Sequence, residues 1–152
     1  MAGRGAVGGG AHQARSWARR RAVQALYQWD LTGQDLAEIE AQFHGGQEMD
    51  RADVGYFREL LHQVPACLDE LRAALAPCLE RPFEALDPVE RTILLIGGYE
   101  LGHRHEIPYR VVISEAVSLA RMFGAEDGFR FVNGVLDRLA RALRAAETAG
   151  GR

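Results

Sequence analysis

The sequence predicts an all-α protein built as a bundle of six or seven helices. Apolar residues recur at spacings of three and four along most of the chain, which is the period of an amphipathic helix, and alternating strand patterns are nearly absent. The chain has 152 residues, of which 47% are apolar and 26% are charged. This composition excludes a disordered chain and predicts one soluble globular domain, because a chain of this length can bury its own core.

The first predicted helix covers residues 13–31 and separates apolar from polar side chains. At about 100° per residue, one arc of this segment contains Ala18, Ala22, Val23, Leu26 and Trp29. The opposite arc contains Trp17, Arg20, Arg21, Gln24 and Gln28, with Tyr27 at its edge. Gly33 ends this helix.

Two further helical segments follow before residue 81. Asp35 can cap a short helix, in which the apolar positions are Leu36, Ile39 and Phe43. A longer stretch from Arg51 to about Glu80 repeats apolar residues at three and four, and Pro65 and Pro77 should kink or split it.

The clearest helix start is Asp87-Pro88-Val89-Glu90. Aspartate suits the N-cap, proline suits the first helical position, and Glu90 is placed to reach back to the cap amide. The continuation RTILLIGGYEL is apolar on nearly every face, which predicts a central helix with Leu94 and Ile96 in the core.

Two helices are predicted after Pro108. The first places Val112, Ala116, Leu119 and Phe123 on one stripe. The second opens after Glu126 and Asp127, and its inward positions are Val132, Val135, Leu136, Leu139 and Leu143.

The two ends of the chain differ in composition from its middle. Residues 1–11 and 145–152 are rich in Gly and Ala and are predicted to be flexible tails, which leaves residues 12–144 as the ordered domain. The first tail lacks the apolar segment of a secretory signal, and no apolar run reaches the length of a membrane span, so we expect a cytoplasmic protein. Cys67 and Cys78 are too far apart along a helix for a disulfide and are expected to be free thiols.

The formal net charge of −3 conceals an asymmetry along the chain. Up to Trp29 there are five Arg and no acidic residue, whereas the remainder has 13 Arg against 21 acidic residues, a charge of −8. Clustered cations attract phosphates, so this split predicts a nucleic-acid contact at the basic end.

Several segments carry a resemblance to a known family. The runs are ARRRAVQALYQWDL, YFRELL, DPVERTILLIGGYEL, IPYRVVISEAVSLARMFGAED and FVNGVLDRLA, and together they span about residues 12–144. The sequence resembles the NusB family of transcription antitermination factors. The resemblance implies a seven-helix fold of two small helical subdomains. It also implies a non-catalytic protein that binds boxA-like RNA of ribosomal RNA transcripts with the small-subunit ribosomal protein NusE, in an antitermination complex with RNA polymerase.

The basic first helix is the main candidate for RNA binding. Recognition of single-stranded RNA needs cations for phosphates and planar side chains on which bases stack. Both kinds are present among Arg15, Arg19, Arg20, Arg21, Gln24 and Tyr27. The alternative is a solvated basic surface, and the family resemblance favours RNA.

The start of the last helix is a second candidate. Phe131 lies about 100° from the stripe led by Val132, so an exposed ring beside an Arg can stack on a base. The alternative is that Phe131 closes the core between subdomains. By analogy with the family, Asp127, Arg130 and Phe131 are assigned to the RNA surface.

Glu90 and Arg91, at the start of the central helix, are candidates for contact with RNA or with the NusE-type partner. A capping role explains Glu90 equally well.

No enzyme, cofactor or metal site is predicted. The chain lacks a phosphate-binding loop and a nucleophile elbow. Glu100, His103, His105 and Glu106 superficially suggest a metal site, but histidines near a helix C-terminus are explained by the helix dipole. Two alternative functions remain open: a helical protein-binding adaptor or homodimer without specific RNA binding, and a detached accessory domain of an RNA-modifying enzyme.

Overall fold

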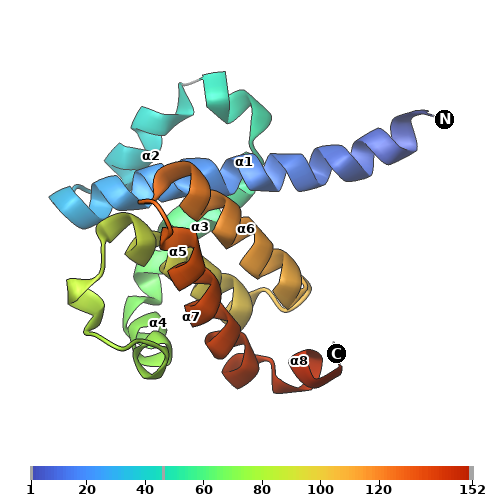
Figure 1. The fold of residues 1–152 in the computed structure, drawn as a ribbon. Helices are drawn as coiled ribbons and strands as arrows, with labels where there is room; N and C mark the ends of the chain where they lie inside the picture. The colour runs from blue at the N-terminus through green and yellow to red at the C-terminus, as the bar shows by residue number, and fades with distance from the viewer. Residues whose placement is uncertain (1, 46, 151–152) are drawn as a thin grey trace. The chain divides into compact units, whose positions relative to one another are not determined.

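The computed structural model describes residues 2–45 and 47–150, and within these ranges it contains helices and turns but no strand. This confirms the all-α prediction. The eight α-helices of the described residues are α1 Ala2–Thr32, α2 Leu36–His44, α3 Val54–Ala66, α4 Leu68–Leu75, α5 Pro88–His103, α6 Tyr109–Phe123, α7 Gly128–Leu143 and α8 Ala145–Gly150 (Figure 1). Short 3₁₀ turns occur at Gln47–Arg51, Ala76–Cys78 and Phe83–Ala85. None of the described helices combines the length and the apolar character that crossing a membrane requires.

The chain divides into two compact units, with the boundary between Pro65 and Ala66. This confirms the prediction of two helical subdomains. The predicted break in the stretch from Arg51 to Glu80 is also present, because α3 ends one residue after Pro65 and α4 begins at Leu68.

The first unit consists of α1, α2, one 3₁₀ turn and α3. Gly33 ends α1 with a φ of 68°, the left-handed conformation that glycine takes at low cost, and the Asp35 side chain accepts a hydrogen bond from the Ala37 amide to cap α2. The Asp53 amide donates to the Ala14 carbonyl over 2.9 Å and ties the start of α3 to α1. The apolar arc of α1 is buried as predicted at Ala18, Ala22, Val23 and Leu26.

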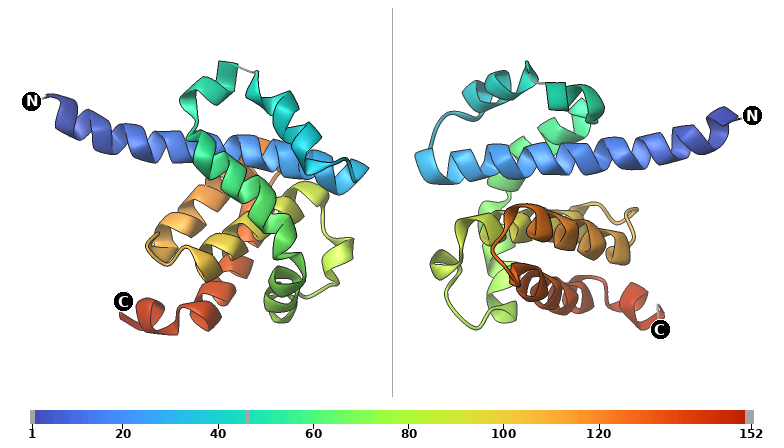
Figure 2. Two further views of the ribbon diagram at one scale, coloured as in Figure 1. Left: turned by 180° about the vertical axis from the view of Figure 1, so that it is seen from behind. Right: turned by 45° about the horizontal axis from the view of Figure 1, so that its top comes forward.

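The second unit is built around α5, α6 and α7, which pack against one another (Figure 2). Leu94 and Ile96 on α5 are buried, which confirms both as core residues. The Asp87 side chain accepts hydrogen bonds from the amides of Val89 and Glu90, each over 3.1 Å, so the predicted N-cap is also confirmed. Leu143 was predicted to point inward, but it is 38% exposed at the last residue of α7.

Both segments that were predicted to be flexible tails are helical in the structure. Residues 2–11 continue α1, although five Gly within them lower the helix propensity, and their flexibility stays a prediction. Residues 145–150 form α8. The Arg144 side chain, buried at the start of this segment, donates to backbone carbonyls of Glu100, Leu101, Arg104 and Ile107. Glu147 accepts from the Tyr109 amide and from Arg144, so α8 is held by specific hydrogen bonds rather than left as a free end.

Candidate nucleic-acid interface

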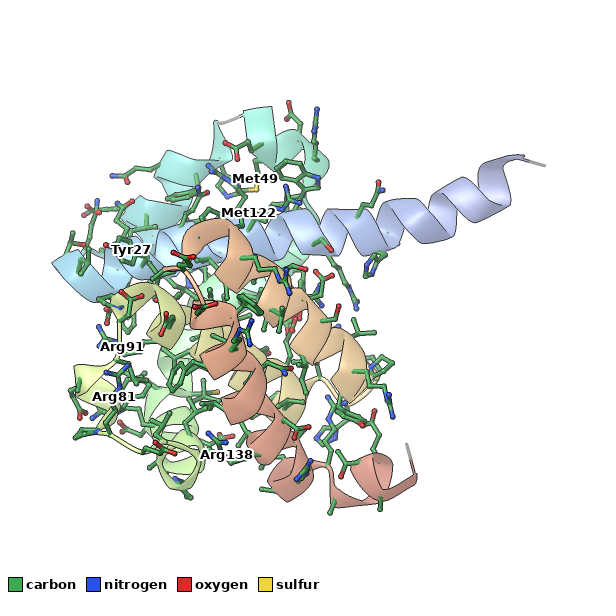
Figure 3. All side chains as sticks on the ribbon, in the orientation of Figure 1. Tyr27, Met49, Arg81, Arg91, Met122 and Arg138 are labelled. Carbon is green, nitrogen blue, oxygen red and sulfur yellow. The ribbon has the colours of Figure 1, made fainter. Side chains whose placement is uncertain are left out.

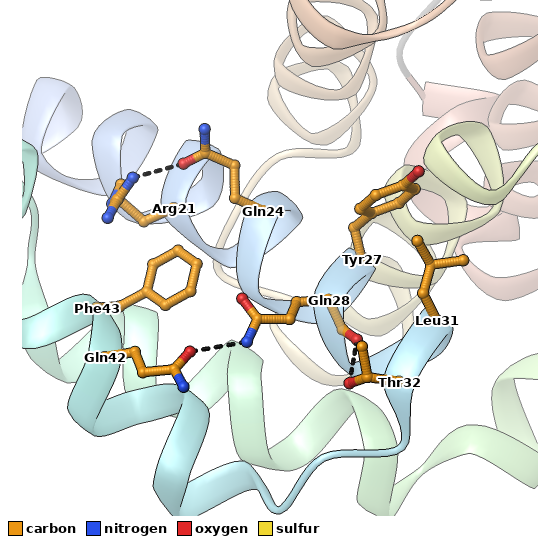
Figure 4. A pocket seen from close by; sticks show the side chains of 8 residues that line it. All are labelled: Arg21, Gln24, Tyr27, Gln28, Leu31, Thr32, Gln42 and Phe43. Atoms are coloured by element: carbon orange, nitrogen blue, oxygen red, sulfur yellow. Dashed lines mark hydrogen bonds between the residues drawn. The ribbon is translucent and has the colours of Figure 1, made fainter.

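A groove of about 520 Å³ lies in the first unit, along the polar face of α1 beside α2 (Figure 4). Its lining consists of Arg21, Gln24, Tyr27, Gln28, Leu31 and Thr32 from α1, together with Gln42 and Phe43 from α2. The α1 members are three or four residues apart along the chain, and this spacing places their side chains on one face of the helix. Three of the predicted RNA-binding residues, Arg21, Gln24 and Tyr27, are therefore brought together.

Arg21 is held at the wall of this groove by contacts on several sides. Its guanidinium donates to the Gln24 amide oxygen over 2.6 Å, lies 3.7 Å from the Glu48 carboxylate and stands 4.6 Å from the centre of the Phe43 ring. Only 13% of the side chain is exposed. Within the described part of the chain, the Arg21 Nε is buried and has no hydrogen-bond partner.

Glutamine amides line the same groove and are joined to each other. The Gln28 side-chain nitrogen donates to the amide oxygens of Gln34 and Gln42, each over 2.7 Å. An amide offers both a donor and an acceptor, which is what hydrogen bonding to a base edge requires. Of the α1 lining, the sequence assigned Arg21, Gln24 and Tyr27 to the site but not Gln28, Leu31 or Thr32. Gln42 and Phe43 were missed because only the packing of α2 on α1 brings them to the groove.

Two further arginines of α1 lie against aromatic rings. The Arg20 guanidinium lies 4.3 Å from the centre of the Trp17 ring, and the Arg15 guanidinium lies 5.1 Å from that of Tyr56. Both side chains are partly exposed, so they can still reach a phosphate.

Arg19 does not lie on the accessible face where it was predicted. It is 2% exposed, and its guanidinium lies 5.5 Å from the centre of the buried Tyr56 ring. The reason is its position four residues before Val23, which places Arg19 on the core side of α1. Its assignment to the phosphate-binding face is therefore wrong.

A second groove, of about 540 Å³, lies in the second unit around Phe131. It is lined by Glu80, Arg81, Arg130, Phe131, Gly134 and Arg138 (Arg81 and Arg138 are labelled in Figure 3). Phe131 is partly exposed, as stacking on a base requires, and the Arg81 guanidinium lies 5.8 Å from the centre of its ring. Arg138 is held by two hydrogen bonds to the Cys78 carbonyl, of 2.9 and 3.1 Å. Arg81 was missed as a site residue, because it lies in a loop far from Phe131 in sequence.

The turn before α7 contains an unusual backbone conformation. Asp127 has a φ of 66°, which lies in the left-handed region of the backbone. Aspartate tolerates this region better than most residues do. Among the described residues other than glycine, only Asp127 has a positive φ. Its side chain is exposed and lies 3.5 Å from the Arg130 guanidinium. Strained turns of this kind are enriched at functional sites.

Glu90 and Arg91 both make contacts within the second unit. The Glu90 carboxylate lies against Gly128, so closely that a Cβ at this glycine would collide with it. Burial, and then the neighbouring Asp87 charge, raise the pKa of Glu90, while Arg81 opposes the increase. Arg91 donates to the carbonyls of Glu84 and Leu86. Their predicted role in partner binding stays a prediction.

The four residues that superficially suggested a metal site do not gather at one point. His103 pairs with Glu70 over 2.7 Å, His105 contacts the Gly102 carbonyl, and Glu106 pairs with Arg104. Cys67 and Cys78 are both free thiols.

Comparison with known proteins matches most of the chain to a single family model. The NusB family model matches residues 16–141. Among similar curated proteins is the transcription antitermination protein NusB of Pseudomonas entomophila, 53% identical over 133 residues, which are 88% of this chain and 80% of the relative. The protein of the same name from Paraburkholderia phytofirmans is 50% identical over 139 residues, which are 91% of this chain and 96% of the relative.

Solved structures with the same fold include an RNA complex. A crystal structure of the antitermination factors NusB and NusE in complex with dsRNA matches with a TM-score of 0.71 and 26% identity, over 84% of this chain and 96% of that chain. The T. maritima NusB structure matches with a TM-score of 0.65 and 26% identity, over 82% of this chain and 90% of that chain.

Proposed function

This chain belongs to the NusB family, and we propose that it acts as a transcription antitermination factor by binding boxA-like single-stranded RNA of ribosomal RNA transcripts. The observation that carries the RNA assignment is the groove of the first unit. It combines the Arg21 guanidinium, the side-chain amides of Gln24 and Gln28, and the ring of Tyr27. These are the groups that single-stranded RNA needs for phosphate contact, base-edge hydrogen bonds and stacking.

The side chains of this groove have different proposed roles in RNA binding. Arg21, with Arg20 and Arg15 nearer the N-terminus, supplies cations for phosphates, which give affinity without reading the sequence. Tyr27 offers a planar surface for an unpaired base. The amides of Gln24 and Gln28 face the same space and read base edges, so sequence preference arises from these two residues.

The groove of the second unit supports a second RNA contact. Phe131 supplies a partly exposed ring, and Arg81, Arg130 and Arg138 surround it with positive charge. An aromatic ring beside guanidinium groups suits a stacked base with its flanking phosphates. Asp127, at the strained turn before α7, belongs to this surface in the proposal.

A NusE-type ribosomal protein is the proposed protein partner, because a structural neighbour of this chain is a complex of NusB and NusE with dsRNA. Glu90 and Arg91 are the proposed residues for that contact. RNA and partner bound to one protein give each other a high effective concentration, so two modest affinities produce a stable assembly in the RNA polymerase antitermination complex. The proposed role is scaffolding without catalysis.

A binding titration tests this function. Fluorescently labelled boxA-like RNA, a scrambled RNA of equal length and a duplex form of the boxA-like RNA are titrated with the protein, with and without the NusE-type partner. The proposal predicts the tightest binding for the boxA-like single strand and a further gain with the partner. Equal affinity for all three RNAs in both conditions would contradict it and favour a protein-binding adaptor.

A further inference from the structure

Three side chains with different metal-binding chemistry meet in the second unit, outside both grooves. The Cys67 sulfur, a carboxylate oxygen of Glu70 and a ring nitrogen of His103 all lie within 4.8 Å of one another. Among the described residues, no other trio of His, Cys, Asp or Glu offers ligand atoms at such spacing. None of the three lines the groove around Tyr27 or the groove around Phe131.

The helices explain why these residues meet. Cys67 is the N-cap residue of α4, and Glu70 follows it by three residues, so both side chains stand on one side of the first turn. His103 is the last residue of α5, and α4 packs against α5. The cluster therefore joins the beginning of one helix to the end of the other.

The geometry leaves these groups accessible and oriented. His103 and Glu70 are exposed and Cys67 is partly exposed, so an ion can reach all three from solvent. The Tyr99 ring stacks on the His103 ring, with centroids 5.1 Å apart and planes inclined by 17°, and this contact limits rotation of the imidazole. The other thiol, Cys78, lies apart from this cluster, with its sulfur 3.9 Å from the Ala74 carbonyl.

We propose that Cys67, Glu70 and His103 form a binding site for a divalent transition-metal ion of the zinc class, with water as the fourth ligand. Thiolate, imidazole and carboxylate together are the ligand set of Zn²⁺, and its chemical analogue Co²⁺ accepts the same groups. The hard ions Mg²⁺ and Ca²⁺ take oxygen ligands and do not favour a thiolate. On binding, the ion replaces the 2.7 Å contact between His103 and Glu70 by a bond to each.

The proton balance of this step follows from the thiol. Burial, and then the Glu70 charge, raise the pKa of Cys67, so the free site holds a neutral thiol at neutral pH. When the ion binds, the sulfur–hydrogen bond breaks, the sulfur electron pair forms the bond to the metal, and one proton passes to the buffer.

A bound ion would link α4 to α5 and stabilise the second unit. A ligand that binds only the folded state raises the unfolding temperature by mass action. Zn²⁺ in excess should therefore increase the thermal stability of the whole chain, independently of any RNA.

Titration with Co²⁺ tests the site, because a Co–thiolate bond produces a near-ultraviolet charge-transfer band that water or imidazole ligands do not. The full chain is kept reduced and titrated alongside Cys67→Ser and His103→Gln, and circular dichroism checks that each variant folds. The matched control is Cys78→Ser, which removes the other thiol. A second control, His62→Gln, removes a histidine that contacts Glu40 in the first unit.

The proposal predicts a charge-transfer band that saturates at one Co²⁺ per chain, in the unaltered protein and in both controls. The band should be absent in Cys67→Ser. Loss of an outer-shell partner alone typically weakens metal affinity 10–100-fold, so loss of the ligand in His103→Gln should weaken it by at least about tenfold. Zn²⁺ should raise the unfolding temperature of the unaltered protein and of Cys78→Ser but not of Cys67→Ser. A band that persists in Cys67→Ser, or equal Zn²⁺ affinity in all variants, would overturn the proposal and indicate adventitious surface binding.

Discussion

The Arg81 guanidinium lies over the ring of Phe131, 5.8 Å from its centre, and the two side chains line one groove. Arg81 comes from the loop before α5 and Phe131 from the first turn of α7, so the pair exists only in the folded second unit. The contact leaves the ring partly exposed. A base that enters this groove therefore meets an aromatic surface next to a positively charged guanidinium.

Substitution Phe131→Ala should weaken binding of boxA-like RNA by about 1–3 kcal/mol, the typical contribution of one stacked base. Stability should change little, because the ring is only partly buried. Phe131→Leu is the matched control, since it keeps apolar volume but removes the ring, and it should lose most of the same affinity. Fluorescence anisotropy with urea unfolding distinguishes the outcomes: large destabilisation with unchanged RNA affinity would assign Phe131 to the core.

Substitution Ile96→Ala should lower the free energy of unfolding by about 2–5 kcal/mol. Ile96 is 1% exposed in the central helix, so truncation removes buried surface and leaves a cavity. Urea unfolding monitored by circular dichroism measures the change. A loss below about 1 kcal/mol, the scale of surface substitutions, would contradict this packing.

Two glycines allow a matched test of how closely helices approach in the second unit. A Cβ on Gly97 would lie 2.7 Å from a methyl carbon of Leu136, whereas a Cβ on Gly134 would lie 3.7 Å from the end of the Arg138 side chain. Gly97→Ala should therefore destabilise the protein by about 1–3 kcal/mol through overpacking. Gly134→Ala should be neutral or stabilising by up to about 1 kcal/mol, because alanine favours the helix. Equal effects in thermal unfolding would show that Leu136 can move aside.

Glu40 should make stability depend on pH in the acid range. Hydrogen bonds from His44 and then His62, together with the Arg58 charge, lower the pKa of Glu40 from 4.5 to about 2. A lowered pKa stabilises the folded state above the unfolded value, so this contribution is complete above pH 4.5 and is lost as pH falls towards 2. Urea midpoints of the unaltered protein and Glu40→Gln should therefore differ most above pH 4.5 and converge near pH 2. A constant difference across this range would contradict the assignment.

The sequence was sufficient for features that depend on helix periodicity and capping. The Asp87 N-cap, the buried Leu94 and Ile96, and the shared face of Arg21 and Gln24 all follow from residue spacing within one helix. Spacing also contained the signal for the burial of Arg19, four residues before Val23.

Features that depend on contacts between distant segments were not predictable. The contribution of Phe43 to the first groove depends on how α2 packs on α1, and α8 is held because Arg144 reaches carbonyls at the end of α5. The meeting of Cys67 with His103 likewise requires two helices that are far apart in sequence. Local propensity contains no information on such pairs.

The salt dependence of RNA binding tests most directly whether the basic face of α1 contacts phosphates. Arg15, Arg20 and Arg21 are partly accessible, and the buried Arg19 is left unchanged because its loss would disturb the core. Each phosphate contact to single-stranded RNA contributes about 0.7 to the slope of log affinity against log salt. Replacing the three arginines by Gln should therefore flatten that slope by about 2 and weaken binding to matched and scrambled RNA alike.

The measurement is the affinity for boxA-like RNA over a series of salt concentrations, for the unaltered protein, the triple variant and Arg141→Gln. Arg141 is an exposed arginine outside both grooves, so its substitution should leave the slope unchanged. A slope flattened by about 2 in the triple variant alone is the result we expect. An unchanged slope with unchanged affinity in the triple variant would contradict RNA binding by this face of α1.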